Sequence, residues 1–302
     1  MTALFRRLPG FWLLGCSILL TLIIVAPWPR PLPRAVALPA PDTAAASSQI
    51  RPAVELSPPG ARRVPVLVYH HLAPASLGLH RHNPMVVPVE LFERQIAWLD
   101  AQGYTTVSLA ELAAFIAGHG SLPQRSVMIT FDDGYESNFR YATPILRRHG
   151  LRAVLFTIGN RVRPDDWAFA PDRTSHVSWQ QLRAMAGGPV WEIGHHTFAG
   201  HDPIDGEPPL VAWSAAEIAA DLATFTAAWK EHGLPQPTAF AYPFGAYDAE
   251  AVTAIAAAGF ELAFTVDPGF VTVGSDPLRL PRLGVFPWHE LAALGKLLAD
   301  GE

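Results

Sequence analysis

The first residues able to do chemistry are two adjacent aspartates, Asp132 and Asp133, which follow the apolar run 127–131. Neighbouring carboxylates resist joint ionisation unless a cation or hydrogen bonds stabilise them. Gly134 permits the sharp turn that lets the two side chains diverge. An Asp-Gly pair is also typical of a simple turn that closes a strand. The pair alone therefore indicates either a stabilised acidic site or a turn.

A second candidate is the segment 192–201, which contains His195, His196 and His201. His196 and His201 lie on a loop, because Gly200 and the Asp-Pro pair that follows His201 oppose a helix. Two imidazoles and one carboxylate form a three-ligand site with open positions, suited to zinc or another divalent ion. A loop histidine by itself is more often a surface residue. Two of them, in a chain that also carries an Asp-Asp pair after a strand, favour a metal site.

Cysteine ligation is excluded, because Cys16 is the only cysteine and cannot build a thiolate site by itself. Any metal must therefore be held by histidines and carboxylates. A third candidate is the pair His70 and His71, which follows the apolar run 64–69. Histidine side chains have a pKa near neutrality, so this pair puts such groups at the end of a predicted strand. The fourth is the turn Pro243-Phe244-Gly245, whose backbone N–H groups could face a developing oxyanion. Taken singly, the histidine pair is also compatible with an ordinary histidine at the edge of a sheet, and the Pro-Phe-Gly turn with an ordinary loop.

The elements that must position these residues alternate between strand and helix. Strands are predicted at 64–69, 105–108, 127–131, 153–158, 191–194, 238–242 and 262–266, several of them apolar throughout, as in strands buried on both faces. Helices are predicted at 88–102, 109–117, 139–149 and 248–258, and two more begin at the capping boxes that start with Ser178 and Ser214. This order indicates one α/β domain, open or closed into a barrel, with its chemistry at the carboxyl ends of the strands.

Composition narrows the class of protein and its location. Half of the 302 residues are hydrophobic, which excludes wholesale disorder, and the net charge of -5 argues against nucleic-acid binding. Arg6 and Arg7 precede an uncharged apolar run at 11–26, so we expect a membrane anchor or export signal over residues 1–28. We expect the anchor to be retained, although cleavage after Ala37 and lipidation at Cys16 are alternatives. A Pro/Ala-rich linker over 29–62 and a catalytic domain over 63–302 would then lie outside the cytoplasm, in the periplasm or at the cell surface.

Together the four segments resemble a known family, the polysaccharide deacetylases of carbohydrate esterase family 4, which share the NodB-homology domain. The resemblance covers roughly residues 64–288, and the run from Thr130 to Gly134 matches the family's first motif. The spacing from His196 to His201 is one residue wider than usual, similar to the branch that deacetylates poly-β-1,6-N-acetylglucosamine. The strand that ends in His70-His71 also resembles that branch. The resemblance implies a single distorted (β/α) barrel of the NodB-homology type.

The resemblance further implies a role for each candidate. Asp133, His196 and His201 would bind a divalent metal, zinc first, with nickel, cobalt or iron as alternatives. Asp132 would stay unligated and act as general base. His70 would protonate the departing amine, with His71 as the fallback. The oxyanion would be held by the metal and by the backbone N–H of Phe244.

Two positions depart from the family pattern. Many members carry an arginine that orients the base where this chain has Ala241, so the residue that orients Asp132 is left unassigned. Phe244 stands where a tyrosine is common, which preserves a backbone role but removes a phenol. Asp267 is a candidate for orienting the acid histidine, with an Asp-Pro turn as the alternative.

The function expected from this resemblance is removal of N-acetyl groups from an exported N-acetylglucosamine polymer, with β-1,6 linkage favoured. Peptidoglycan or a chitin-like oligosaccharide is the alternative substrate. A polysaccharide-binding protein without turnover and a non-haem iron oxygenase are alternatives of other classes. Expected partners are the N-acetylated polysaccharide, the inner membrane and polymer-export proteins. Trp167 and Trp213, in loops that flank the second motif, are candidates for stacking on sugars, with loop packing as the alternative.

Overall fold

The computed structural model describes residues 60–301. The expected anchor at 1–28, Cys16 and nearly all of the linker at 29–62 lie outside the described residues. Within residues 60–301, none of the helices combines the length and the apolar character needed to cross a bilayer.

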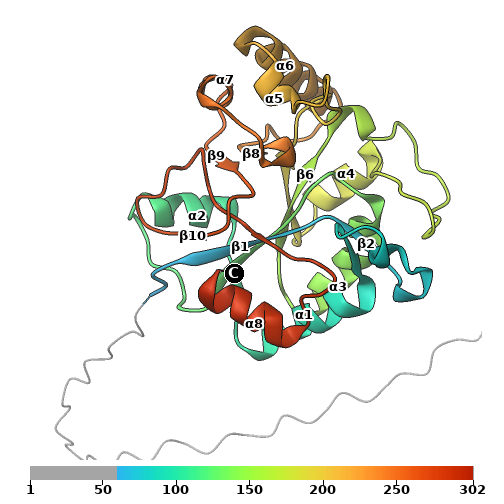
Figure 1. Ribbon diagram of the computed structural model, residues 1–302, viewed down its shortest axis with the longest axis vertical. Helices are drawn as coiled ribbons and strands as arrows, with labels where there is room; N and C mark the ends of the chain where they lie inside the picture. Colours follow the sequence, from blue (N-terminus) through green and yellow to red (C-terminus); the bar gives the residue numbers. More distant parts are fainter. Residues whose placement is uncertain (1–59, 302) are drawn as a thin grey trace, which may run out of the picture. The chain divides into compact units, whose positions relative to one another are not determined.

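A strongly curled, mixed sheet forms the centre of the described residues (Figure 1). Its parallel strands follow one another in the order β1 (Val64–Tyr69), β5 (Ser126–Phe131), β6 (Ala153–Thr157), β7 (Trp191–His195), β8 (Ala239–Ala241) and β9 (Leu262–Phe264). The register pairs Tyr69 with Phe131, so the residues that follow β1 and β5 leave the sheet side by side. Strand β4 (Thr105–Thr106) pairs with β5, and β10 (Phe270–Val271) runs antiparallel to β1.

The segment that follows β9 returns across the sheet to β1. Leu280 exchanges backbone hydrogen bonds with β9 and its neighbour, accepting from Thr265 at 2.9 Å and donating to Ala263 at 2.8 Å. A few residues later β11 (Leu283–Gly284) pairs with β1, and Val285 donates to Val68. The expected α/β class is confirmed. The expected barrel takes the form of a half-barrel, in which this segment links β9 to β1.

Helices cover the sheet and begin largely where the sequence predicts. They are α1 (Val89–Ala101), α2 (Leu109–Ile116), α3 (Thr143–Arg148), α4 (Trp179–Ala186), α5 (Pro209–Ala212), α6 (Ala215–Glu231), α7 (Ala249–Ala257) and α8 (Leu291–Asp300). Both predicted capping boxes form, at Ser178 with Gln181 and at Ser214 with Glu217. The short strands β2 (His71–Ala73) and β3 (Val86–Pro88) and helix α8, which lies beside α1 (Figure 1), were not predicted.

The core fixes the strand ends from which the candidate residues project. Phe92 of α1 packs edge-on against Tyr69 and Phe131, with ring centroids at 5.2 and 5.6 Å. All three side chains are fully buried. Because β1 and β5 end at these packed rings, the last residues of the two strands have little freedom to move apart.

Candidate metal centre and active site

The structure brings the three expected metal ligands together. Asp133 follows β5, while His196 and His201 belong to the loop after β7, and one ligand atom from each lies within 4.8 Å of the other two. Oδ1 of Asp133 is 3.1 Å from Nε2 of His201 and 3.6 Å from Nε2 of His196. This oxygen is buried and has no hydrogen-bond partner among the described residues. A buried carboxylate oxygen without a partner is unfavourable, and a cation would satisfy it. The residues therefore fit a divalent metal.

The hydrogen bond made by His196 sets which nitrogen faces the site. Its Nδ1 lies 2.7 Å from the carbonyl oxygen of Ala241 and must donate to it. In the neutral imidazole the lone pair is then on Nε2, on the side of Asp133, as is usual for a metal-binding histidine. In the protonated ring Nε2 carries a hydrogen that faces the carboxylate of Asp133. Burial raises the pKa of Asp133, but the two histidines outweigh burial and hold that pKa well below its usual range. The carboxylate is therefore ionised over the whole neutral range.

Backbone strain is concentrated at this site. Three of the four non-glycine residues with positive φ among residues 60–301 are Asp133 (69°), Thr197 (66°) and Phe244 (59°). One is a metal-ligand candidate, one follows His196, and one is the oxyanion candidate. Such a conformation costs on the order of 1 kcal/mol or more and persists only where the surroundings enforce it.

Asp221 of α6 holds the loop between the two histidines. Its Oδ2 accepts the backbone N–H of Phe198 and its Oδ1 accepts that of Ala199, each at 2.7 Å. These bonds restrain the loop that separates His196 from His201. Sequence analysis missed Asp221, because nothing in the local pattern of α6 distinguishes it from a solvated helical aspartate.

The base candidate Asp132 is oriented by Arg282. Nη1 and Nη2 of Arg282 donate to the two carboxylate oxygens of Asp132 at 2.8 and 2.7 Å, and Nε donates to the carbonyl of Thr265 at 2.7 Å. Burial raises the pKa of Asp132, but the charge and hydrogen bonds of Arg282, with the nearby His196, lower it below the usual range. This fills the role that sequence analysis left open at Ala241. The segment that leads into β11 contains two arginines, Arg279 and Arg282, and the sequence alone does not show which of them reaches Asp132.

His70 and His71 point into different cavities. His70, half-buried, lines the same cavity as the metal triad. Burial lowers the pKa of His70, and the opposing influence of Asp132 and Asp133 is not enough to restore it. His71 is buried, with Nδ1 at 3.0 Å from Oγ of Ser137 and a pKa lowered by burial to about 4. It lines a separate cavity of about 200 Å³ and is not among the residues that line the cavity of the triad.

The turn after β8 presents Phe244 to the cavity. The N–H groups of Gly245 and Ala246 bond within the turn, and among residues 60–301 the N–H of Phe244 donates to no backbone carbonyl. Its ring lies against His201, with centroids at 4.5 Å.

The carboxylate of Asp267 accepts a hydrogen bond from the hydroxyl of Tyr247 at 3.0 Å. The expectation that Asp267 orients the acid histidine is therefore not supported.

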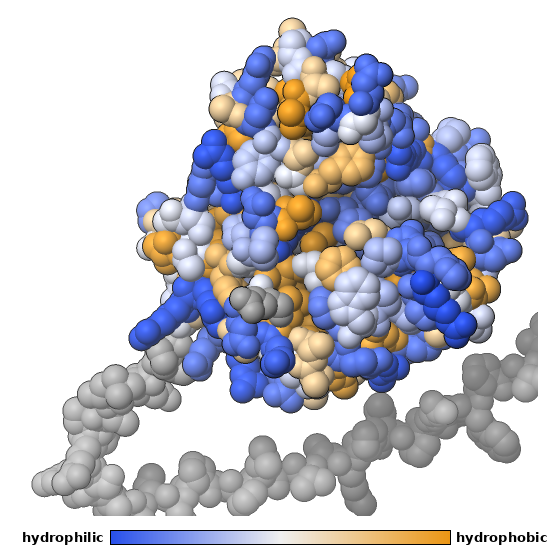
Figure 2. All heavy atoms as spheres, viewed as in Figure 1, coloured by the Kyte–Doolittle hydropathy of each residue, from blue (hydrophilic) through white to orange (hydrophobic). Residues whose placement is uncertain are grey.

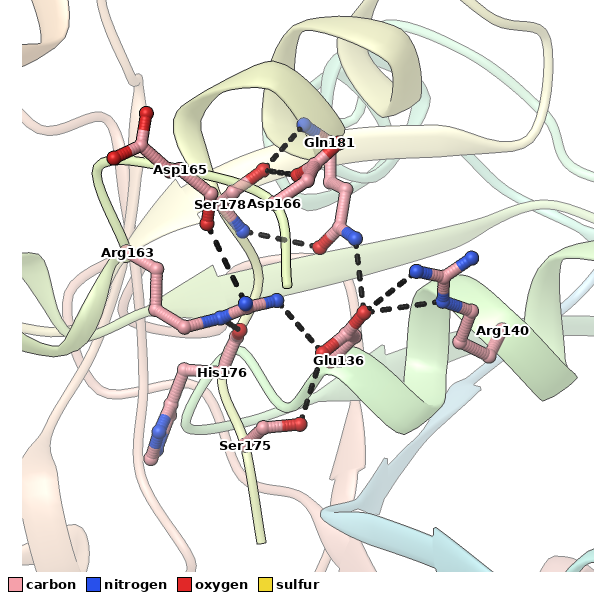
Figure 3. A network of polar contacts seen from close by, with 9 residues as sticks. All are labelled: Glu136, Arg140, Arg163, Asp165, Asp166, Ser175, His176, Ser178 and Gln181. Carbon is pink, nitrogen blue, oxygen red and sulfur yellow. Dashed lines mark hydrogen bonds and ion pairs between the residues drawn. The ribbon is translucent and has the colours of Figure 1, made fainter. Parts of the chain in front are cut away.

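A largely buried ion-pair network begins just after the Asp-Asp-Gly turn in the chain, and Figure 3 shows its side chains. At its centre is Glu136, whose carboxylate oxygens accept hydrogen bonds at 2.7–3.1 Å from the side chains of Arg140, Arg163, Ser175 and Gln181. The loop before α4 is thereby tied to the turn, and Val177 donates its N–H to the carbonyl of Gly134 at 2.9 Å. Sequence analysis did not identify this network.

The site opens into a cavity of about 790 Å³ that Asp132, Asp133, His70, His196, His201 and Phe244 line together. Its remaining wall is largely apolar and includes Met85, Val266, Phe286 and Trp288. An apolar pocket with convergent polar groups on one side is typical of an enzyme site that orients a substrate.

Comparisons with known proteins agree with this geometry. The sequence model of the polysaccharide deacetylase family matches residues 119–263, which include Asp132, Asp133, His196, His201 and Phe244. YxkH of Bacillus subtilis, provisionally named a polysaccharide deacetylase, is 28% identical over 77% of this chain and 75% of its own length. The poly-β-1,6-N-acetyl-D-glucosamine N-deacetylase of Escherichia coli is 27% identical over 66% of this chain. The chain spans only 33% of that enzyme's length.

Among solved structures, IcaB from Ammonifex degensii superposes with a TM-score of 0.68 at 26% identity. The superposition covers 80% of this chain and 98% of IcaB. The curled half-barrel is thus shared with that protein over nearly its entire length.

Proposed function

Since the chain belongs to the polysaccharide deacetylase family and is a hydrolase acting on carbon–nitrogen bonds, we propose that its substrate is an exported polymer of β-1,6-linked N-acetylglucosamine. The observation that carries the proposed chemistry is the convergence of Asp133, His196 and His201 in a cavity that Asp132 also lines. The linkage is supported by similarity to the Escherichia coli enzyme of that specificity and by the wide histidine spacing.

Asp133, His196 and His201 would hold the metal, zinc first, with nickel, cobalt or iron as alternatives. A divalent cation bound there lowers the pKa of a water molecule and polarises the acetyl carbonyl. Asp132, ionised and fixed by Arg282, accepts the proton that the attacking water loses. A carboxylate has about four lone-pair directions, so two bonds from Arg282 leave room for this proton.

The remaining residues act on the amide as its carbon–nitrogen bond breaks. The N–H of Phe244 donates to the oxygen of the former carbonyl, where negative charge develops. His70 gives a proton to the departing nitrogen, which leaves as the free amine of the sugar while acetate carries the new carbon–oxygen bond. Burial lowers the pKa of His70, while the neighbouring Asp132 and Asp133 favour its protonated form.

We further propose a location for the enzyme from its N-terminal sequence. Arg6 and Arg7 before the apolar run at 11–26 support an anchor in the inner membrane, with residues 63–302 outside the cytoplasm as the catalytic domain. An exported polymer is accessible there, and proteins of polymer export are the expected partners.

The test is release of free amine from N-acetylglucosamine oligomers of β-1,6 and β-1,4 linkage, with and without a chelator. The proposal predicts chelator-sensitive release, faster from the β-1,6 oligomer, and loss of release in Asp132→Asn. Preference for the β-1,4 oligomer would reassign the substrate to a peptidoglycan-like or chitin-like chain. Binding without release by the metal-loaded wild type would contradict the catalytic proposal.

A further inference from the structure

Two tryptophans among residues 60–301 expose more than half of their surface, Trp288 (60%) and Trp167 (63%). Only Trp288 lines the cavity that contains the metal triad. Trp167 instead lies against the guanidinium of Arg163, 5.1 Å from its ring. Trp213, the other candidate from the sequence, is half-buried and packs against the hydrophobic cluster around Phe240. The tryptophan that lines the metal cavity is therefore Trp288, and neither Trp167 nor Trp213 does so.

Trp288 lies in a turn whose neighbouring residues are anchored by hydrogen bonds. Its ring stacks on Phe286 with centroids 4.9 Å apart and planes inclined by 21°. Phe286 donates its N–H to Nδ1 of His289 at 3.1 Å and accepts the N–H of His289 at 2.9 Å. The carbonyl of His289 accepts the side-chain amide of the fully buried Gln95 at 2.7 Å. A ligand that stacks on this indole would need to order little of the protein, which favours binding.

The cavity is larger than an acetyl group requires. Its volume of about 790 Å³ lies in the range of roughly 300–1,000 Å³ that holds a drug-sized ligand. Exposed apolar side chains continue this wall at Phe244 and Val266. In the face shown in Figure 2, apolar side chains gather in the hollowed middle and hydrophilic ones surround them.

A glucosamine ring suits an indole face. With its substituents equatorial, a β-linked glucosamine ring presents C–H groups on both faces, which are apolar and slightly positive. The face of an indole carries the negative part of the ring quadrupole, and it also attracts the ammonium group of a deacetylated residue. We infer that Trp288, supported by Phe286, is a stacking subsite for the sugar ring next to the residue being deacetylated, an inference that rests on the proposed function.

The test compares the full chain with Trp288→Ala, Trp288→Phe and Trp167→Ala. Trp167→Ala is the matched control, because it removes an equally exposed tryptophan outside the cavity. Amine release from a β-1,6-linked N-acetylglucosamine pentamer is measured against hydrolysis of a small aryl acetate. Calorimetry measures binding of the fully deacetylated pentamer, which requires no turnover.

For Trp288→Ala we expect the ratio of kcat/KM for the pentamer to that for the aryl acetate to fall about tenfold, chiefly through KM. The Kd for the deacetylated pentamer should rise by about the same factor. Trp288→Phe should retain most of the kcat/KM ratio and most of the affinity for the deacetylated pentamer. Trp167→Ala should match the wild type in both measurements. Unchanged values in Trp288→Ala, or an equal loss in Trp167→Ala, would overturn the subsite. Failure of the wild type to release amine from any oligomer would instead overturn the proposed function, while the calorimetry would still test the subsite.

Discussion

Replacing Arg282 by methionine removes the cation that lies against both oxygens of Asp132. The two side chains are almost completely buried, at 0% and 3% exposure. Methionine fills much of the same volume but leaves the carboxylate buried and uncompensated. Breaking a buried pair in this way costs about 3–5 kcal/mol, a large part of the roughly 5–15 kcal/mol by which a domain is stable. At about 2–4 °C per kcal/mol for a domain of this size, the melting temperature should fall by roughly 6–20 °C.

The same variant should change the pH dependence. The pKa of Asp132 is lowered in the folded protein, so its ionisation contributes stability above the unfolded pKa of about 3.9 that is lost as the pH falls through the folded pKa. Without Arg282, burial dominates and raises that pKa. The penalty of Arg282→Met should therefore be largest at neutral pH and shrink on acidification. The acidic limb of the kcat/KM profile should move to higher pH, because a base with a raised pKa is already protonated at a higher pH.

Thermal unfolding at several pH values and the pH profile of amine release measure both effects. The double variant Asp132→Leu/Arg282→Met is the control, because it replaces the pair with apolar groups. It should recover much of the stability but none of the activity. If Arg282→Met has the wild-type melting temperature and its kcat/KM falls at the same acidic pH as that of the wild type, Arg282 is not the residue that orients and ionises Asp132.

Four further predictions follow from the site. Asp132→Asn should keep its metal in elemental analysis but lose about 10²–10⁴-fold in turnover, and wild-type turnover would remove Asp132 from the base role. His201→Ala should lose metal on purification, whereas His119→Ala, an exposed control, should keep it; equal occupancy would argue against His201 as a ligand. His70→Ala should lower kcat for amine release, and a rate equal to the wild type would assign the acid elsewhere. Glu136→Gln should lose on the order of 3 kcal/mol in denaturant unfolding at neutral pH. Because the pKa of Glu136 is lowered in the folded protein, the difference in unfolding free energy between wild type and variant should shrink at pH values below the unfolded pKa of about 4.3. A difference that does not change with pH would contradict an ionised Glu136 at the centre of the network.

Local sequence patterns predict the elements and residues that depend on neighbouring positions in the chain. Apolar runs located β1, β5, β7 and β8, and capping boxes located the starts of two helices. Parallel strands end at one edge of a sheet, so the polar residues that follow them were expected to meet, as Asp133, His196 and His201 do. The chemistry of the triad could therefore be proposed before its geometry was known.

The residues that support the site could not be found in this way. Arg282 is 150 residues from Asp132, and no local pattern links the two. Asp221 and Glu136 look like ordinary charges near helices, and only folding shows which backbone or side-chain groups they accept. Trp288 lies in a turn before the unpredicted helix α8, and its place in the cavity depends on how that helix packs beside α1. Tertiary packing decides each of these positions.

The account depends most directly on one ion held by Asp133, His196 and His201. Anomalous diffraction from crystals of the metal-loaded protein, collected on both sides of the metal's absorption edge, would locate that ion. The account predicts one strong peak about 2.0–2.2 Å from Oδ1 of Asp133 and from Nε2 of both histidines, with Asp132 outside bonding distance. A peak bonded to Asp132 in place of Asp133, or no peak between these residues in fully active protein, would contradict it.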